Sequence, residues 1–153
     1  MTALITLGYT PDVQTWHGFR ATARTMLAEV LECDPLVIEA QLAQYFAGQL
    51  NTFTVPLHLP GSEFAREVWA HLLQIPYGHT ATYGAIAADL GKPGASRAVG
   101  LANGHNRLSI VVPCHRVIGA DGSLTGYGGG QPRKAFLLRL ENAAVQLTQQ
   151  LAF

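Results

Sequence analysis

An apolar run that leads directly into a cysteine and a histidine constrains the fold of this chain more than any other feature. Residues 108–112 are apolar apart from Ser109, and this short pattern predicts a buried strand. A glycine-rich loop over residues 119–130 follows the run Pro113-Cys114-His115-Arg116-Val117. A buried cysteine beside a histidine is the minimum set for an activated thiolate nucleophile. The pair alone is weak evidence, because buried cysteines mostly act as small hydrophobic residues.

Length and composition indicate an ordered protein of one or two small domains. The chain has 153 residues, of which 48% are hydrophobic and 13% charged, so disorder is not expected. It contains no apolar stretch long enough to span a membrane, and its first residues lack the features of a signal peptide. Two cysteines, Cys33 and Cys114, make no disulfide framework and no zinc-ligand spacing. A reducing, cytoplasmic location fits best.

Charge is balanced overall but divided along the chain. The net charge is zero, with two basic against five acidic residues in 1–60 and eight against five in 61–153. Neutrality argues against an electrostatic nucleic-acid binder, whereas the mildly basic second part is compatible with one.

The chain is expected to divide at the Pro60-Gly61 turn. In residues 1–60 we predict a strand at 3–7, a helix at 25–31 and a clearer helix that starts at Pro35. These elements predict a small, divergent αβ domain.

Residues 61–153 carry sharper signals. Ser62 is a candidate N-cap for a helix whose apolar residues recur at helical spacing, and Thr82 caps a shorter helix at 83–90. A helix at 95–102 follows the tight turn at 92–94, and this pair of helices has the helix-turn-helix pattern. A last helix opens at Gln131-Pro132, with Phe136, Leu137 and Leu140 as its expected apolar face. We therefore predict an α/β (α+β) fold.

Cys114 needs a base and a group that orients the base. His115 would point to the opposite face of a strand, so contact with Cys114 would need a turn or a bridging water. Glu141, on the last helix, could hold the imidazole in one tautomer. The alternative is a core cysteine beside a surface histidine.

For the other candidate functional residues, an ordinary structural role is again the alternative. Arg97 lies where a recognition helix meets DNA, or is a solvated arginine. Tyr83 is a hydroxyl donor or a core aromatic. In the polar connector 101–106, an asparagine (Asn103 or Asn106) ties two backbone segments together, or both are loop residues.

These residues together resemble the O6-alkylguanine-DNA alkyltransferase family, over about residues 56–141. The matching motifs are FAREVW (64–69), IPYG (75–78), TYG (82–84), SRAVG (96–100), Asn106, IVVPCHRVIG (110–119) and GYGG (126–129). Spacing is kept without gaps over residues 83–141, whereas residues 1–55 match far less well. Arg107 departs from the family pattern, which usually has proline there.

The resemblance implies a role for each matching residue. Cys114 corresponds to the alkyl acceptor, and His115 and Glu141 to the relay that deprotonates it through water. Tyr83 corresponds to the phenol that supports proton delivery, and Asn106 to the hinge asparagine. The matches to DNA-contacting positions are Thr82, Ser96, Arg97 (the intercalating finger), Ala98 and Gly100, and the matches to the base pocket are Tyr83, Val117, Tyr127 and Gly128.

The resemblance also implies the reaction. It is DNA repair by a single, irreversible transfer of an alkyl group from O6-alkylguanine, with O4-alkylthymine as a further candidate, to the protein. Residues 61–153 would form the alkyltransferase catalytic and winged helix-turn-helix domain, and residues 1–60 the small αβ domain. A monomer that acts on double-stranded DNA is expected, with no cofactor and no metal, since this chain lacks the cysteines of the family's zinc-binding variants.

Three rival functions are an alkyltransferase-like protein and, from other classes, a winged-helix regulator and a Cys-His hydrolase. An alkyltransferase-like protein binds lesions without transfer, but those relatives lack the acceptor cysteine. A winged-helix regulator would use Cys114 only structurally, and a Cys-His hydrolase would need an oxyanion hole and multiple turnovers.

Overall fold

The computed structural model describes residues 35–141 of the chain. The strand predicted at 3–7, the helix predicted at 25–31 and Cys33 lie outside these residues. The chain divides into two compact units, 1–60 and 61–153. The assignment of an αβ domain to the first, and of catalysis and DNA binding to the second, remains a prediction.

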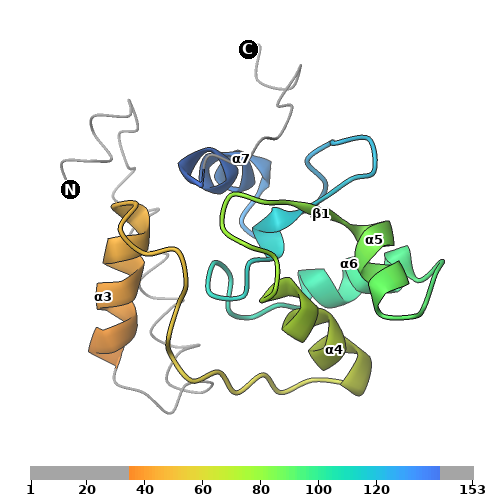
Figure 1. Cartoon of the computed structure of the whole chain (residues 1–153), viewed down its shortest axis with the longest axis horizontal. Coiled ribbons are helices and arrows are strands. Elements are labelled where there is room, and N and C mark those ends of the chain that lie inside the picture. The colour runs from red at the N-terminus through yellow and green to blue at the C-terminus, as the bar shows by residue number, and fades with distance from the viewer. Residues whose placement is uncertain (1–34, 142–153) are drawn as a thin grey trace. The chain divides into compact units, whose positions relative to one another are not determined.

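The described part of the first unit contains helix α3, Pro35–Phe46 (Figure 1). The helix expected to start at Pro35 is confirmed. Its buried side chains are Ile38 and Tyr45. The Gln41 amide holds the segment after the helix, since it donates to Thr54 Oγ1 at 2.7 Å and accepts from Thr54 N at 3.0 Å.

The second unit begins with helix α4, Glu63–Leu72. Ser62 caps it as predicted, because its hydroxyl accepts a hydrogen bond from Ala65 N at 3.2 Å. Trp69 is buried, and its indole nitrogen donates to Ala102 O at 2.9 Å. This bond ties α4 to α6, the helix that contains Ala102.

Two short helices follow, α5 (Tyr83–Asp89) and α6 (Ser96–Gly104), as the sequence predicted to within two residues. Thr82 caps α5 through a bond from Ala85 N to its hydroxyl. The turn between them uses Gly91 and Gly94 with φ of 68° and 93°, which favour glycine. The buried residues Ile86, Ala87, Val99 and Ala102 lie on their inner faces.

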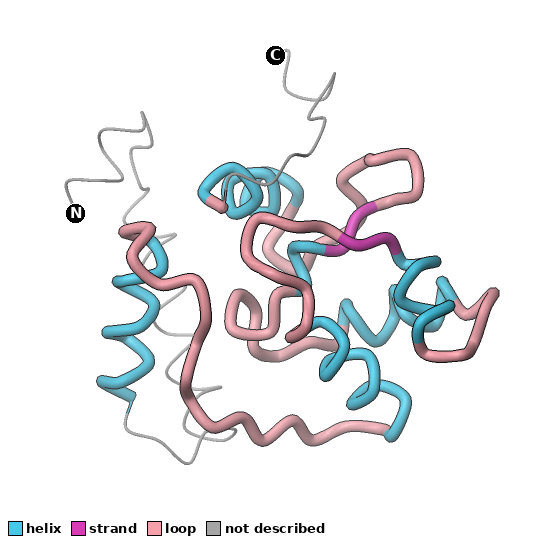
Figure 2. The backbone as a smooth tube through the Cα atoms, viewed as in Figure 1, coloured by secondary structure: helices cyan, strands magenta, loops and turns pink. Residues whose placement is uncertain are grey.

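Strand structure in the second unit is small. β1 (Ala81–Thr82) pairs in parallel with β2 (Val117–Ile118), with Ala81 opposite Val117. Figure 2 shows this as a short strand pair among helices and loops. It places the start of α5 beside the residues that follow Cys114.

Helix α7, Gln131–Leu140, closes the described chain, with Pro132 in its first turn as predicted. Its apolar face was predicted only in part. Leu137 is buried, but the other buried residues are Lys134, Ala135 and Leu138, whereas Phe136 and Leu140 are half-buried. The described chain is therefore mostly helical with a small parallel sheet, and none of its helices is long and apolar enough to cross a bilayer.

Candidate active site

The prediction of a strand at residues 108–112 is wrong. The segment is buried as expected, but it forms turns with a single bridge between Ser109 and Val112. Ile110 has a φ of 80°, a left-handed conformation that a strand cannot contain. The Asn106 side chain stabilises the turns, donating to Val112 O at 2.8 Å and accepting from Leu108 N at 3.0 Å. This is the tie between backbone segments that the sequence suggested for Asn106.

Cys114 therefore begins a helical turn instead of ending a strand. The 3-10 turn η1, Cys114–Arg116, is closed by the Arg116 N to Pro113 O bond of 3.0 Å. Cys114, His115 and Arg116 are 3%, 0% and 6% exposed. The turn allows adjacent side chains to project into one buried region, so the surface-histidine alternative is wrong.

Glu141, directly after α7, is the centre of the buried hydrogen-bond network. Its carboxylate accepts from His115 Nε2 at 2.9 Å. It also accepts from Arg116 Nε at 2.8 Å and Nη2 at 2.9 Å, and from Gly78 N at 3.4 Å. Such a bidentate pair with arginine holds a carboxylate ionised and in one orientation. The predicted partnership of His115 with Glu141 is thus present.

The hydrogen bond to Glu141 fixes the tautomer of His115. An ionised carboxylate can only accept, so Nε2 carries the proton and Nδ1 has the free lone pair. Nδ1 is buried without a hydrogen-bond partner among the described residues. Burial lowers the pKa of His115, more than the Glu141 hydrogen bond raises it. The imidazole is consequently a neutral base at ordinary pH.

Cys114 is a protonated thiol at rest, because burial raises its pKa. Hydrogen bonds from Asn106 and Ser109 and the charge of Lys134 oppose this shift. Cys114 Sγ lies 4.0 Å from Ser109 Oγ. The described residues show no direct hydrogen bond between Cys114 and His115, so the structure does not join the two ends of the predicted relay.

The residues predicted for the base pocket differ in their contacts and in their burial. Tyr83 accepts a hydrogen bond from Thr125 Oγ1 at 2.8 Å. Burial and the nearby Cys114 raise the pKa of Tyr127. Val117 is buried at the end of the turn, whereas Gly128 is exposed.

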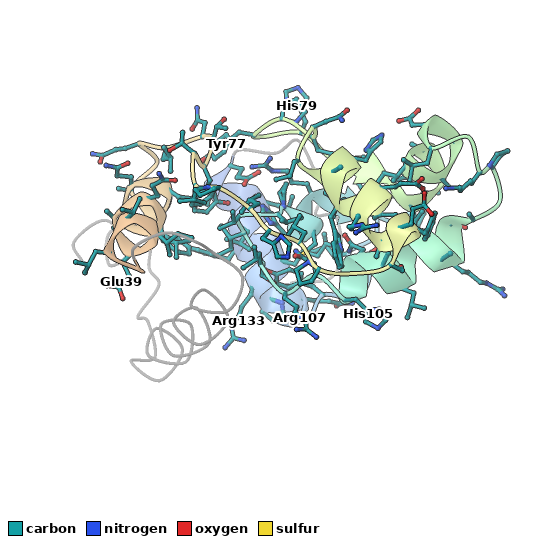
Figure 3. The ribbon with its side chains drawn as sticks, turned by 90° about the horizontal axis from the view of Figure 1, so that it is seen from below. Glu39, Tyr77, His79, His105, Arg107 and Arg133 are labelled. Carbon is teal, nitrogen blue, oxygen red and sulfur yellow. The ribbon has the colours of Figure 1, made fainter. Side chains whose placement is uncertain are left out.

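The predicted DNA-contacting residues are spread over the start of α5 and along α6. Arg97 and Ala98 are exposed, and Ser96 and Gly100 are half-buried. A Cβ atom at Gly100 would lie 3.7 Å from the Tyr83 ring, so α6 passes close to the candidate pocket. Thr82 caps α5, so its hydroxyl has a structural role. In Figure 3 the side chains of His105 and Arg107, which follow this region, point away from the ribbon, and both are exposed.

Sequence reasoning missed several residues of the site. No role was predicted for Arg116 beyond its place in the matching motif, yet it donates twice to Glu141 and once to Ile75 O, at 2.6 Å. Asn103 was not missed, since a tie between backbone segments was suggested for an asparagine of its connector, and its Nδ2 donates to Cys114 O at 3.4 Å. Ser109 Oγ lies 4.0 Å from Cys114 Sγ, and the charge of Lys134 lowers the pKa of the thiol. For Lys134 a signal existed, since helical spacing places it on the same face as the apolar Leu137 and Leu138.

A metal site finds no support in the described residues. No group of three or more His, Cys, Asp or Glu side chains within residues 35–141 is arranged to hold an ion.

Comparison with known proteins agrees with the resemblance. Residues 63–143 match the family profile "6-O-methylguanine DNA methyltransferase, DNA binding domain". A methylated-DNA--protein-cysteine methyltransferase of Mycolicibacterium paratuberculosis is 65% identical over 101 residues, which are 66% of this chain and 61% of that protein. This chain thus matches less than two thirds of the length of that curated relative.

Solved structures give the same result. The crystal structure of Mycobacterium tuberculosis OGT in complex with DNA superposes with a TM-score of 0.68 at 60% identity, covering 69% of this chain and 66% of that one. A structure of S. pombe ATL in complex with DNA gives a TM-score of 0.51 at 33% identity, over 61% of this chain and 87% of that one. Because the family profile matches more than half of its residues, this chain belongs to the O6-methylguanine DNA methyltransferase family.

Proposed function

We propose that this protein repairs DNA by one irreversible transfer of a methyl or other alkyl group from O6-alkylguanine to Cys114. O4-alkylthymine is a further candidate substrate. The observation that carries the proposal is a buried thiol beside a neutral histidine that Glu141 fixes in one tautomer. A relative with 65% identity over 101 residues carries the name methylated-DNA--protein-cysteine methyltransferase, which supports the proposal.

The proposed step is a direct displacement. The proton of Cys114 passes to His115 Nδ1, directly or through one water molecule, as in general-base catalysis. The thiolate attacks the alkyl carbon, a carbon–sulfur bond forms, and the carbon–oxygen bond breaks with its electron pair left on guanine. The hydroxyl of Tyr83 supports delivery of a proton to guanine, so one proton leaves the protein's thiol and one reaches the base. The thioether is stable, hence each molecule acts once and needs no cofactor.

The DNA-binding part of the proposal rests on α5 and α6. We take them as a winged helix-turn-helix in which Thr82, Ser96, Ala98 and Gly100 face double-stranded DNA. Arg97 would fill the space that the damaged base leaves when it is extruded, an event that costs a few kcal/mol. The base would then lie against Tyr83, Val117, Tyr127 and Gly128. A relative, M. tuberculosis OGT, was solved in complex with DNA.

The same proposal assigns residues 61–153 to catalysis and DNA binding and residues 1–60 to a small αβ domain, in a monomer that acts on chromosomal DNA inside the cell.

Mass spectrometry tests the proposal directly. Incubation with duplex DNA containing O6-methylguanine should add one methyl group per molecule, on the peptide that contains Cys114. The Cys114→Ala variant should bind the duplex and gain no mass. Methyl on Cys33 would contradict the assignment, and lesion binding without any mass gain would favour a non-catalytic lesion-binding protein like the alkyltransferase-like relatives.

A further inference from the structure

The loop at residues 75–78, Ile-Pro-Tyr-Gly in sequence, lies against the buried ion pair of Arg116 and Glu141. Arg116 Nη1 donates to Ile75 O at 2.6 Å, and Gly78 N donates to Glu141 Oε2 at 3.4 Å. Gly78 has a φ of 76°, and a Cβ atom there would lie only 2.9 Å from Glu141 O. Glycine thus lets the loop backbone approach Glu141 closely. The loop therefore holds both members of the ion pair through its backbone.

Tyr77, labelled in Figure 3, is the side chain of this loop that lies over the pair. Its hydroxyl donates to Leu140 O at 3.1 Å, which ties the phenol to the last residue of α7. Burial and the charge of Glu141 raise the pKa of Tyr77, so this hydroxyl stays protonated and can donate. The Arg116 guanidinium carbon lies 5.8 Å from the centroid of the ring, within the range of a cation–π contact. The half-buried ring therefore covers a guanidinium that is itself only 6% exposed.

Exclusion of water matters both for the ion pair and for His115. Glu141 is 1% exposed, and His115, whose Nε2 donates to it, is 0% exposed. An ion pair loses much of its attraction where water raises the local dielectric constant. Burial has the largest influence on His115 and lowers its pKa, as the charges of Arg116 and Lys134 also do, whereas Glu141 raises it. Water at this centre would therefore make the imidazole easier to protonate.

We propose that Tyr77 is a positioning residue whose ring excludes water from the Arg116–Glu141 pair and so keeps His115 a neutral base. The hydroxyl anchors the ring to the end of α7, and the ring in turn covers the guanidinium. This inference deepens the proposed function and rests on it, because a neutral His115 is the base of the proposed transfer.

NMR titration of the His115 ring tests the role of Tyr77 without DNA, so its result is separate from that of the methyl-transfer experiment. The pKa of His115 is measured in the full chain for the wild type, Tyr77→Ala and Tyr77→Phe. Tyr77→Ala removes the cover and should raise the pKa of His115 by about one pH unit, a tenfold fall in the ratio of neutral to protonated imidazole. Tyr77→Phe keeps the ring and should titrate like the wild type, with a slightly lower melting temperature because the bond to Leu140 O is lost.

Phe64→Ala is the matched control, since Phe64 is also a half-buried aromatic residue beside a cation. Lys92 Nζ lies 4.9 Å from the centroid of its ring. This variant should lower the melting temperature and leave the His115 titration unchanged. A merely structural role of Tyr77 would give that same pattern in Tyr77→Ala, which overturns the proposal. An equal shift in Tyr77→Phe would assign the effect to the hydroxyl and overturns it as well.

Tyr77→Leu covers the case in which Tyr77→Ala does not fold. Leucine retains apolar contacts of the loop but is too small to cover the guanidinium as the ring does. The pKa of His115 should therefore rise in the same direction by a smaller amount. An unchanged His115 titration in folded Tyr77→Leu protein would contradict the role of the ring.

Discussion

The Cys114 turn and the outer face of α6 differ in how their side chains are held. In the turn, His115 and Arg116 are buried and bonded to residues from distant parts of the chain, with Glu141 at the centre. On α6, Arg97 and Ala98 are exposed, and Leu101 is 64% exposed. The turn is held by internal bonds, whereas the helix face presents its side chains to solvent.

This difference separates two kinds of effect. A change in the turn alters protonation and stability together, because each buried charge there depends on its partners. A change on the α6 face should leave the fold intact and, under the proposed function, alter only interactions with DNA. The following variants are ordered by the size of the effect that this contrast predicts.

Glu141→Gln should have the largest effect. The amide keeps the shape of the side chain but leaves the Arg116 charge unpaired and no longer fixes the tautomer of His115. Breaking a buried pair costs about 3 kcal/mol of the free energy of unfolding. Transfer should slow by about a hundredfold or more, the usual contribution of a general base.

Urea unfolding and single-turnover transfer measure the two effects of Glu141→Gln, and DNA affinity should stay near wild type. Glu63→Gln, which changes an exposed acid at the start of α4, is the control. Wild-type transfer by Glu141→Gln near pH 7 would show that the relay is wrong.

The same contrast explains what the sequence could predict. The caps Ser62 and Thr82 and the limits of α5 and α6 were predicted because their signals are local. The apolar run at 108–112 was correctly predicted to be buried but not to be a turn. Its conformation depends on Asn106 and on the unusual backbone of Ile110, which hydrophobic patterning does not report.

Two buried charged residues, Arg116 in the turn and Lys134 on α7, were the hardest to interpret. In a sequence, Arg116 and Lys134 look like surface residues, since lysine and arginine are seldom fully buried without a partner. Arg116 has its partner 25 positions away at Glu141, and Lys134 binds carbonyls rather than an acid. Only the folded arrangement shows these contacts, whereas the link from His115 to Glu141 was available through the family resemblance.

Arg97→Ala should have an intermediate effect that depends on the substrate. If Arg97 stabilises the extruded state, its loss removes part of the energy that offsets flipping, and each 1.4 kcal/mol slows duplex repair about tenfold. Free O6-benzylguanine needs no flipping, so its rate should be almost unchanged.

Both rates are measured by single-turnover transfer, with Arg66→Ala, an exposed arginine on α4, as the control. Equal losses on the duplex and the free base would assign Arg97 to the chemistry or to folding instead of to the DNA-facing surface.

Ser109→Ala should have the smallest effect on transfer, and it is best compared with Ser62→Ala, which removes a hydroxyl from a helix cap. Its hydroxyl, 4.0 Å from Cys114 Sγ, lowers the pKa of the thiol through a weak hydrogen bond. A loss of about 0.5–1 kcal/mol of thiolate stabilisation slows transfer a few-fold, with little change in stability. Ser62→Ala should show the opposite pattern, since losing an N-cap costs about 1 kcal/mol of stability and leaves transfer unchanged. Single-turnover rates and melting curves of both variants measure the two effects. If Ser109→Ala transfers as fast as the wild type, the Ser109 hydroxyl does not stabilise the thiolate.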